Sequence, residues 1–400
     1  MQEKRYSVYE LLLAFSTALL LLFSCAKAND AGPGLSISDA SLARSASSSS
    51  MVFHLILNSV SNKDVSVEFA LKEGTAHTPA DFESKNGTVT IPAGKNEGTI
   101  EVTIAGNAQD TRQPNLQFTV QLTNPKNCTL TTAAATGTIV TENGSYLPTD
   151  NTGYSTPSSY PGFTLAWSDE FSGKSVDMNS WNMEIGNGDG GWGNNELEYY
   201  TGTSHNVFVS NGNLIIEARQ EKTGNFNFTS CRMTTQNKKE FTFGRIDMRA
   251  KLPVGKGIWP ALWMLGSNIT SVGWPACGEI DIMELIGIHP STVYGTLHWS
   301  KSGTHDSKGS SYDLASGNFA DQFHVYSLIW VKDSLQILID DQKYFEISAT
   351  EIGQANYPFN APEFLIFNVA VGGNWPGPPD NSTVFPERMF VDYVRVFQKQ

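Results

Sequence analysis

Short runs in which apolar and polar residues alternate recur along the chain from residue 34 onward. Val52 to Leu57 and Thr99 to Ile104 are two of them, and Arg245 to Leu252 is a third. Because successive side chains of a strand point to opposite faces, such runs predict half-buried β-strands. The second half of the chain contains no long run with helical spacing. We therefore expect an all-β protein.

Composition divides the chain into parts. Residues 34–144 predict an immunoglobulin-like β-sandwich, because short strands are separated by turns rich in Gly, Pro and Asn. Residues 145–161 hold prolines among Ser, Thr and Tyr without apolar periodicity, which predicts a linker. Residues 162–400 predict a second, larger β-sandwich, whose last strand runs from Met389 to Phe397.

Residues 1–25 have the features of an export signal. Lys4 and Arg5 precede an apolar run, Leu11 to Phe23, that is short for a membrane span but suits a signal peptide. The run ends just before Cys25, in a sequence that resembles a bacterial lipoprotein signal. That resemblance implies acylation of Cys25 and anchoring to the outer membrane or cell surface. Ordinary secretion with cleavage nearby is the alternative.

Net charge and cysteine content limit the partners and the cross-links. The formal net charge of -13 argues against nucleic acid and fits an uncharged polymer. Apart from Cys25, the cysteines are Cys128, Cys231 and Cys277. Cys231 and Cys277 lie on segments that neighbouring strands would bring together, but sequence cannot test the Cα separation that a disulfide requires. We favour free, buried thiols.

Three carboxylates, Glu279, Asp281 and Glu284, fall within one short segment whose other residues are mostly apolar and β-favouring. In a regular strand Glu279 and Asp281 share one face, and Glu284 lies on the other. One extra residue around Ile282 and Met283, a β-bulge, would return Glu284 to the acidic face. The segment therefore predicts a kinked strand that presents three acids together.

Such a group of acids suits glycoside hydrolysis. A retaining glycosidase uses two carboxyl groups about 5 to 5.5 Å apart, one as nucleophile and one as acid/base. Because like charges this close cannot all ionise cheaply, one acid should keep its proton near neutral pH, and we expect Glu284 to be that acid. An acidic edge strand or a calcium loop is the alternative interpretation. Trp259, Trp263 and Trp274 lie nearby in the sequence, and indoles stack on the apolar faces of sugar rings.

Several separate segments resemble glycoside hydrolase family sixteen, and within it the laminarinase-like endo-β-1,3-glucanases. The segments are Trp167 to Phe171, Gly191 to Thr201, Gly244 to Arg249, Trp259 to Trp263, Gly278 to Glu284 and Gly372 to Gly377. The resemblance implies a jelly-roll β-sandwich with an open cleft that hydrolyses internal β-1,3 bonds of β-glucans with retention, without a catalytic cofactor. The extra Met283 resembles the laminarinase branch.

The same resemblance implies roles for single residues. Glu279 matches the nucleophile, Glu284 the acid/base and Asp281 the acid between them. Positions on or beside the cleft of the family match Asn195, Arg232, Trp259, Trp263, Trp274 and His298. Trp375, in a Gly/Pro-rich loop, is expected at the cleft rim. Two alternatives stay open, because Arg232 would also pair with a surface acid and His298 would also serve as a core imidazole.

Family members commonly hold a structural calcium on the side opposite the cleft. The resemblance implies that the backbone carbonyls of Glu170 and Gly212 and the carboxylate of Asp392 would bind it here. Asp392 alternates with apolar residues, so the solvated face of a strand is the alternative interpretation.

The first sandwich resembles a Calx-β repeat. The match rests on Gly74 to Ala76, Asp81-Phe82, Gly87 to Gly94, Phe118 to Leu122 and Gly137 to Ile139. The acidic clusters that bind calcium in that family are reduced here to Asp110 and Glu142 in the corresponding stretches, so we do not expect calcium there. A spacer or a glycan-contacting role is favoured.

The sequence thus predicts a monomeric, lipid-anchored endo-β-1,3-glucanase whose partner is a β-glucan polysaccharide. A mixed-linkage β-1,3-1,4-glucanase or a transglycosylase of the same fold is one alternative. A non-catalytic, glycan-binding surface lipoprotein is another, although the presence of all three acids favours an enzyme.

Overall fold

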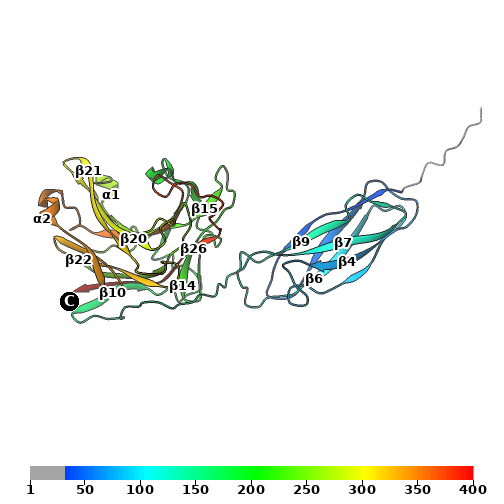
Figure 1. Cartoon of the computed structure of the whole chain (residues 1–400), viewed down its shortest axis with the longest axis horizontal. Coiled ribbons are helices and arrows are strands. Elements are labelled where there is room, and N and C mark those ends of the chain that lie inside the picture. Colours follow the sequence, from blue (N-terminus) through cyan, green and yellow to red (C-terminus); the bar gives the residue numbers. More distant parts are fainter. Residues whose placement is uncertain (1–31, 400) are drawn as a thin grey trace, which may run out of the picture. The chain divides into compact units, whose positions relative to one another are not determined.

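The computed structural model describes residues 32–399 and confirms the all-β prediction (Figure 1). The described chain forms two compact units, the first comprising residues 32–40, 50–103 and 117–138, and the second residues 41–49, 104–116 and 139–399. The predicted signal peptide and its Cys25 lie outside the described residues. Within residues 32–399, no helix is long and apolar enough to cross a membrane.

The strands between residues 34 and 140 form two sheets, as expected of a sandwich. The order of one sheet is β6-β3-β1-β8, with bounds Glu97–Ile104, Ser49–Leu57, Gly34–Ile37 and Thr129–Leu130. The order of the other is β2-β9-β7-β4-β5, with bounds Ala40–Ala43, Ala134–Val140, Leu116–Lys126, Val65–Glu73 and Asn86–Ile91. Phe82 stacks on Phe118 in the core, with ring centroids 4.5 Å apart. Apolar burial between the sheets therefore holds this sandwich together.

The second unit is a larger sandwich of two antiparallel sheets. Its back sheet has the order β13-β14-β26-β17-β22-β23-β24, with β10 also paired to β26. The bounds of these strands are Val207–Ser210, Asn213–Ala218, Glu387–Lys399, Gly244–Lys251, His324–Val331, Ser334–Ile339, Gln342–Ser348 and, for β10, Phe163–Asp169. The predicted last strand is confirmed as β26.

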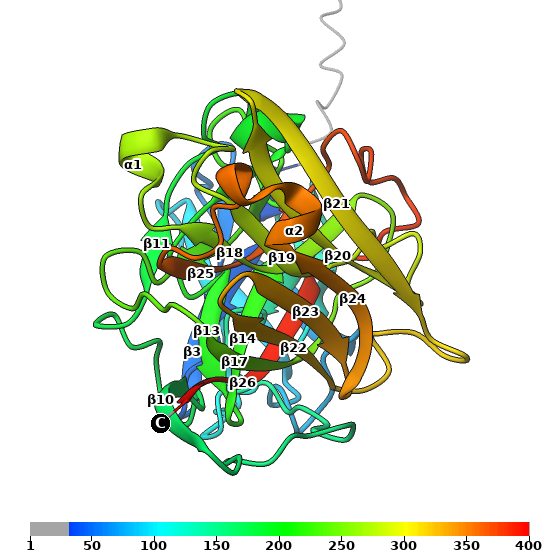
Figure 2. The same cartoon turned by 90° about the vertical axis from the view of Figure 1, so that its left-hand side faces the viewer.

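The other sheet of this unit, here called the cleft sheet, contains the strand β19, and Figure 2 labels most of its strands. Its order is β11-β16-β25-β18-β19-β20-β21, with bounds Asn182–Glu184, Arg232–Thr234, Glu363–Val371, Ile258–Gly266, Glu279–Glu284, Thr292–Lys301 and Thr304–Asp313. The shorter elements are β12 and β15, α1 and α2, a π turn and a 3-10 turn, with bounds Glu198–Tyr200, Phe228–Ser230, Ile269–Val272, Ala349–Ile352, Gly191–Asn195 and Gln354–Asn356.

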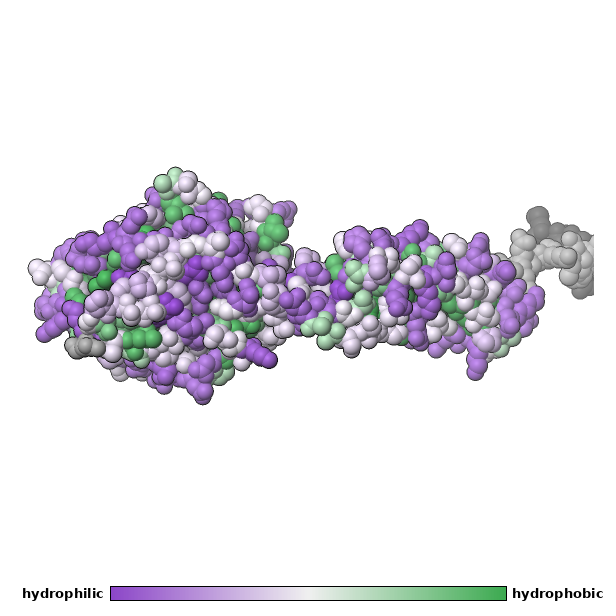
Figure 3. Space-filling model, turned by 90° about the horizontal axis from the view of Figure 1, so that it is seen from below, coloured by the Kyte–Doolittle hydropathy of each residue, from purple (hydrophilic) through white to green (hydrophobic). Residues whose placement is uncertain are grey.

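Side chains of the cleft sheet alternate between the core and the cleft. On β20, Val293, Leu297 and Trp299 are buried in the core between the sheets, whereas Thr296 and His298 are half-buried and line the cleft. The period of two therefore supplies both a packed core and a polar floor. On the molecular face seen in Figure 3, the surface is mostly hydrophilic and its hydrophobic residues form small separate patches.

The segment 145–161, for which the sequence predicts a linker, is hydrogen-bonded to the second unit. Arg249 donates from Nε to the carbonyl of Tyr154 at 2.6 Å and from Nη2 to the carbonyl of Asn151 at 2.8 Å. The backbone N–H of Thr156 donates to the Tyr393 hydroxyl at 2.9 Å. These contacts make the segment an ordered border of the second unit, although its composition is that of a linker.

Removal of this segment should therefore destabilise the second unit. A fragment of residues 162–400 loses the two hydrogen bonds that Arg249 donates to this segment, and a hydrogen bond to a charged group contributes about 1.5 to 3 kcal/mol. Relative to a fragment of residues 145–400, we expect Tm to fall by about 5 °C or more, since about 2 to 4 °C accompanies each kcal/mol in a domain of this size. Calorimetry of both fragments measures this, and equal Tm values would contradict it.

Candidate active site

The acidic strand β19 contains the predicted bulge. Against β18, Leu262 pairs with Met283 and Trp263 pairs with Asp281, which leaves Ile282 as an extra residue. The pairing of β19 with β20 shows the same shift between Asp281 and Glu284. Ile282 and Met283 are both fully buried. Since two successive residues point into the core, the next residue, Glu284, returns to the cleft face.

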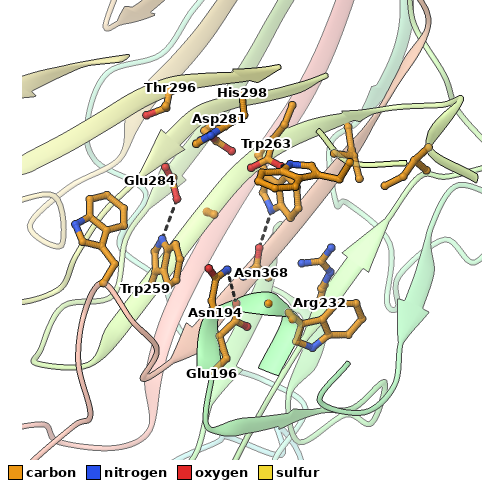
Figure 4. Close-up of a pocket in the computed structure, with 18 of the residues that line it drawn as sticks. Asn194, Glu196, Arg232, Trp259, Trp263, Asp281, Glu284, Thr296, His298 and Asn368 are labelled. Carbon is orange, nitrogen blue, oxygen red and sulfur yellow. Dashed lines mark hydrogen bonds and ion pairs between the residues drawn. The ribbon is translucent and has the colours of Figure 1, made fainter. Parts of the chain in front are cut away.

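Glu279, Asp281 and Glu284 all line one cleft of about 640 Å³, and each has its own partner. The Nε1–H of Trp274 donates to Oε2 of Glu279 at 2.6 Å. The Nε1–H of Trp259 donates to Oε1 of Glu284 at 3.0 Å, as Figure 4 shows. Nε2 of His298 lies 3.1 Å from Oδ2 of Asp281. The acids are therefore held in fixed and different environments.

Burial is the main cause that shifts the titration of two of these acids. It raises the pKa of Glu284 well above its usual range, and the negative charges of Asp281 and Glu279 raise it further. The hydrogen bond from Trp259 opposes the shift. Burial likewise raises the pKa of Asp281, together with the charge of Glu279 and a hydrogen bond with it. Glu284 therefore keeps its proton to a higher pH than an exposed glutamic acid.

A calcium ion suits this cluster poorly. Glu279, Asp281 and His298 bring one ligand atom each within 4.8 Å of one another. However, the N–H of Trp274 points at Glu279, and calcium prefers six to eight oxygen ligands rather than an imidazole nitrogen. The surroundings favour a proton-transfer site over the calcium loop that the sequence left open.

Aromatic residues line the cleft on both sides of the acids. Trp259 and Trp263 both face it from β18, as their spacing of four predicts. Trp274 and Trp375 also line it, and they are 50% and 40% exposed, so both rings are available to a ligand. The Trp375 ring meets that of Trp259 edge-on at 5.5 Å between centroids. These indoles supply stacking surfaces for the apolar faces of sugars.

Arg232 lies at the cleft between two indoles. Its guanidinium lies 4.3 Å from the ring centroid of Trp192 and 4.8 Å from that of Trp263. Its Nε also donates to Oε2 of Glu184 at 2.5 Å. Both interpretations of Arg232 are thus compatible, because the Glu184 pair orients the side chain while the remaining donors face the cleft.

Asn195, one of the predicted cleft residues, does not line the cleft. Its Nδ2 donates to Oδ1 of Asn374 at 2.8 Å, which ties two loops together. Asn194 and Glu196, on either side of it, line the cleft instead. The reason is the π turn at residues 191–195, where left-handed φ angles at Trp192 and Asn195 break the simple alternation of side chains.

A chain of hydrogen bonds that the sequence analysis missed connects these residues beneath the cleft. Trp263 Nε1 donates to Oδ1 of Asn368 at 2.8 Å, and Asn368 Nδ2 donates to the Tyr200 hydroxyl at 3.2 Å. Tyr200 donates to Oε2 of Glu196 at 3.1 Å, and Asn194 Nδ2 donates to its Oε1 at 3.4 Å. The one signal was Asn368 itself, a lone amide within the buried apolar strand β25.

The three residues expected to bind calcium meet at the back sheet. β10 pairs with β26 up to Asp169 opposite Val394, and β14 pairs with it from Leu214 opposite Val391. Glu170 directly follows the end of β10, and Gly212 directly precedes the start of β14. Both residues therefore lie near the same part of β26, beside Asp392. Two arginines bind the carboxylates. Arg395 donates from Nε to Oε1 of Glu170 at 2.8 Å and from Nη2 to Oε2 at 2.7 Å. Arg249 donates from Nη1 to Oδ2 of Asp392 at 2.8 Å.

The cysteines of the described chain are free, buried thiols, as the sequence analysis favoured. Cys128, Cys231 and Cys277 are free and buried within the described residues. The Cys231 thiol lies 3.8 Å from the sulfur of Met183, so it is part of the core rather than of a disulfide.

Comparison with known proteins assigns the family. The profile of the family described as Glycosyl hydrolases family 16 matches residues 194–395, half of the chain. The chain belongs to glycosyl hydrolase family 16. The profile described as Calx-beta domain matches residues 29–143. The Calx-beta match covers every segment that carried that resemblance, and the family 16 match covers its segments from Asn194 onward but not Trp167 to Phe171.

Similar proteins include glucanases. A Beta-glucanase of Rhodothermus marinus is 39% identical over 251 residues, covering 60% of this chain and 86% of the relative. The Glucan endo-1,3-beta-glucosidase A1 of Niallia circulans is 39% identical over 261 residues, which span 60% of this chain but only 38% of that protein. A laminarinase catalytic domain of Thermotoga petrophila is similar in structure, with TM-score 0.56, 49% identity, and coverage of 60% of this chain and 98% of the other.

Proposed function

We propose that this family 16 chain is a retaining endo-β-1,3-glucanase acting on laminarin-type β-glucans. The observation that carries the proposal is the bulged strand β19, which turns Glu279, Asp281 and Glu284 into one cleft lined with indoles. The cleft holds four carboxylates, including Glu196, and Arg232 is paired with Glu184, so an uncharged polymer suits it better than a sulfated one.

The proposed reaction is a double displacement. A carboxylate oxygen of Glu279 attacks the anomeric carbon while Glu284 gives its proton to the departing glycosidic oxygen. Glu284, now a carboxylate, then takes a proton from a water molecule, whose oxygen attacks the same carbon and releases Glu279. Burial of Glu284 keeps its proton available for the first step, and the N–H of Trp259 stabilises the carboxylate that forms. Asp281, whose carboxylate lies close to that of Glu279, would hydrogen-bond it and balance the charge between the two steps, as the family resemblance implies.

Product analysis across several polymers tests the proposal. We expect new reducing ends from laminarin and curdlan and none from agarose. Hydrolysis of lichenan at a comparable rate would support the mixed-linkage alternative instead. Binding of laminarin without any release of reducing ends would support a glycan-binding lipoprotein and contradict the enzyme.

We also propose that the back sheet binds a structural calcium ion. The backbone carbonyls of Glu170 and Gly212 and the carboxylate of Asp392 would hold it, since the pairing of β10 and β14 with β26 brings these residues together. Next to Gly212, the buried Oδ1 of Asn213 has no hydrogen-bond partner among the described residues, as expected near a missing cation. All four donors are oxygens, which calcium prefers.

Chelation should therefore lower the stability of the second unit. At a free calcium concentration of 100 times Kd, the bound ion adds about 2.7 kcal/mol. That corresponds to a Tm shift of about 5 to 10 °C in a domain of this size. Calorimetry with EDTA, then with excess calcium or magnesium, measures the shift. Restoration by calcium alone is expected, and a Tm unchanged by EDTA would contradict the site.

Lipid anchoring at Cys25 is a further part of the proposal and is supported by the sequence alone. A diacyl or triacyl group on Cys25 would hold the protein on a membrane, because each buried methylene contributes about 0.8 kcal/mol. Cells fed radiolabelled palmitate should label the intact protein but not C25A. Labelling that persists in C25A would rule out this attachment point.

A further inference from the structure

His305, on β21, contacts the partners of two of the three acids. Its Nε2 lies 2.9 Å from Nδ1 of His298, and the two imidazole rings stack with centroids 5.1 Å apart. Its ring also packs on Trp274, with centroids 4.7 Å apart. None of the segments that carried the family resemblance includes residue 305. The residue nevertheless lines the cleft.

These contacts close a ring of five side chains. Glu279 accepts the hydrogen bond from Trp274, Trp274 packs on His305, and His305 bonds His298. His298 in turn lies beside Asp281, and a carboxylate oxygen of Asp281 lies within 4.8 Å of one of Glu279. The pairing of β20 with β21 explains the geometry, because His298 is directly opposite Ser307 and His305 is its diagonal neighbour on the same face.

The ring of His298 has one neighbour on each of its nitrogens, His305 at Nδ1 and Asp281 at Nε2. Oδ2 of Asp281 is buried and lies 3.1 Å from Nε2 of His298, yet it makes no well-aligned hydrogen bond among the described residues. A small ring rotation therefore decides whether this contact becomes a hydrogen bond. The χ2 torsion of histidine is broad, so a partner on Nδ1 is needed to hold the ring.

Either of two proton arrangements keeps the ring in place. In the first, Nε2–H of His305 donates to Nδ1 of His298, and Nε2–H of His298 donates to the Asp281 carboxylate. In the second, Nδ1–H of His298 donates to Nε2 of His305, and protonated Asp281 donates to Nε2 of His298. In both, the hydrogen bond on one ring nitrogen sets the role of the other.

We propose that His305 is a positioning residue that holds His298 toward Asp281 and Trp274 toward Glu279. The proposal deepens the proposed function, because it assigns a supporting residue to the same acids. The titratable groups around the histidine pair are Glu279, Asp281 and Glu284 from β19, and the ion pair of Lys301 with Asp306 on its own hairpin. His305 acts through Trp274 and His298, not through the sugar.

Nitrogen NMR of the imidazoles tests the structural part without any substrate. The 15N shifts of Nδ1 and Nε2 of His298 report its tautomer, and we expect them to change in H305A. They should return toward wild-type values in H305Q, because an amide offers both a donor and an acceptor to Nδ1 of His298. Unchanged shifts in H305A would overturn the proposal. This measurement does not depend on the substrate. A failure of the positioning proposal can therefore be distinguished from a failure of the proposed function.

Kinetics on laminarin test the functional part. We expect H305A to lower kcat by about tenfold, a loss typical of a small misplacement of reacting groups, with KM changed less than about twofold. The pH profile of kcat should shift in H305A, and H305Q should recover most of the rate. H289A removes an exposed histidine of the same unit and is the matched control. A raised KM at unchanged kcat would mean direct sugar contact and overturn the proposal, as would equal losses in H305A and H305Q at unchanged Tm.

Discussion

Replacing Glu279 by Ser is expected to abolish hydrolysis while leaving substrate binding nearly intact. Loss of a nucleophile lowers kcat on the order of 10⁴-fold or more, because no covalent intermediate forms. The indoles and Arg232, which supply the binding contacts, are all retained in E279S, and only Trp274 loses a hydrogen bond. Calorimetric titration with a laminari-oligosaccharide should therefore give a Kd within about threefold of wild type. Reducing-end release from laminarin measures the rate.

The matched control for this substitution is E346S. Glu346 lies on β24 of the back sheet, where it pairs with Lys343 at the surface. The same change of side chain there should leave hydrolysis unaltered. Hydrolysis retained by E279S would refute the nucleophile assignment, and loss of both binding and turnover would mean that Glu279 supports the cleft structure instead.

Replacing Glu284 by Gln is expected to lower kcat on laminarin by about 10²- to 10⁴-fold, the usual contribution of general acid–base catalysis. The loss should be smaller on an aryl glycoside, because its leaving group departs without a proton. Azide should then accelerate E284Q by attacking the glycosyl-enzyme, which no longer has a base to activate water. Azide rescue on laminarin itself, where the leaving group is not activated, would contradict the assignment.

The pH dependence gives the same assignment a second test. Activity needs protonated Glu284, so it should fall as pH rises through the raised pKa of this group. On the aryl glycoside, E284Q should lack this alkaline limb. Burial also raises the pKa of Glu387, on the back sheet, to about 7. E387Q is therefore the control. If the alkaline limb disappeared in E387Q, the titration would belong to Glu387, and the assignment to Glu284 would be wrong.

Much of this site could be predicted because it follows local rules of strand geometry. The odd spacing between Asp281 and Glu284 required a bulge, and the spacing of four between Trp259 and Trp263 placed both on one face. The roles of these residues came from the family resemblance, and the E279S and E284Q variants test them.

Other features depend on the pairing of distant segments and had no local signal. His305 reaches Trp274 and His298 only because β21 pairs with β20 in one register. Asn194 and Glu196 line the cleft and Asn195 does not, because a turn with left-handed residues does not follow the alternation of a strand. The segment 145–161 has a linker composition, but backbone carbonyls bind Arg249, and carbonyls leave no trace in composition.

Covalent trapping tests the central claim most directly. A laminaribiosyl fluoride with fluorine in place of the 2-hydroxyl slows the second displacement, so the glycosyl-enzyme accumulates and can be digested and weighed. The account predicts one added glycosyl group on the peptide carrying Glu279, and none in E279S. A label on Asp281 or Glu284, or no label together with a product of inverted configuration, would contradict it.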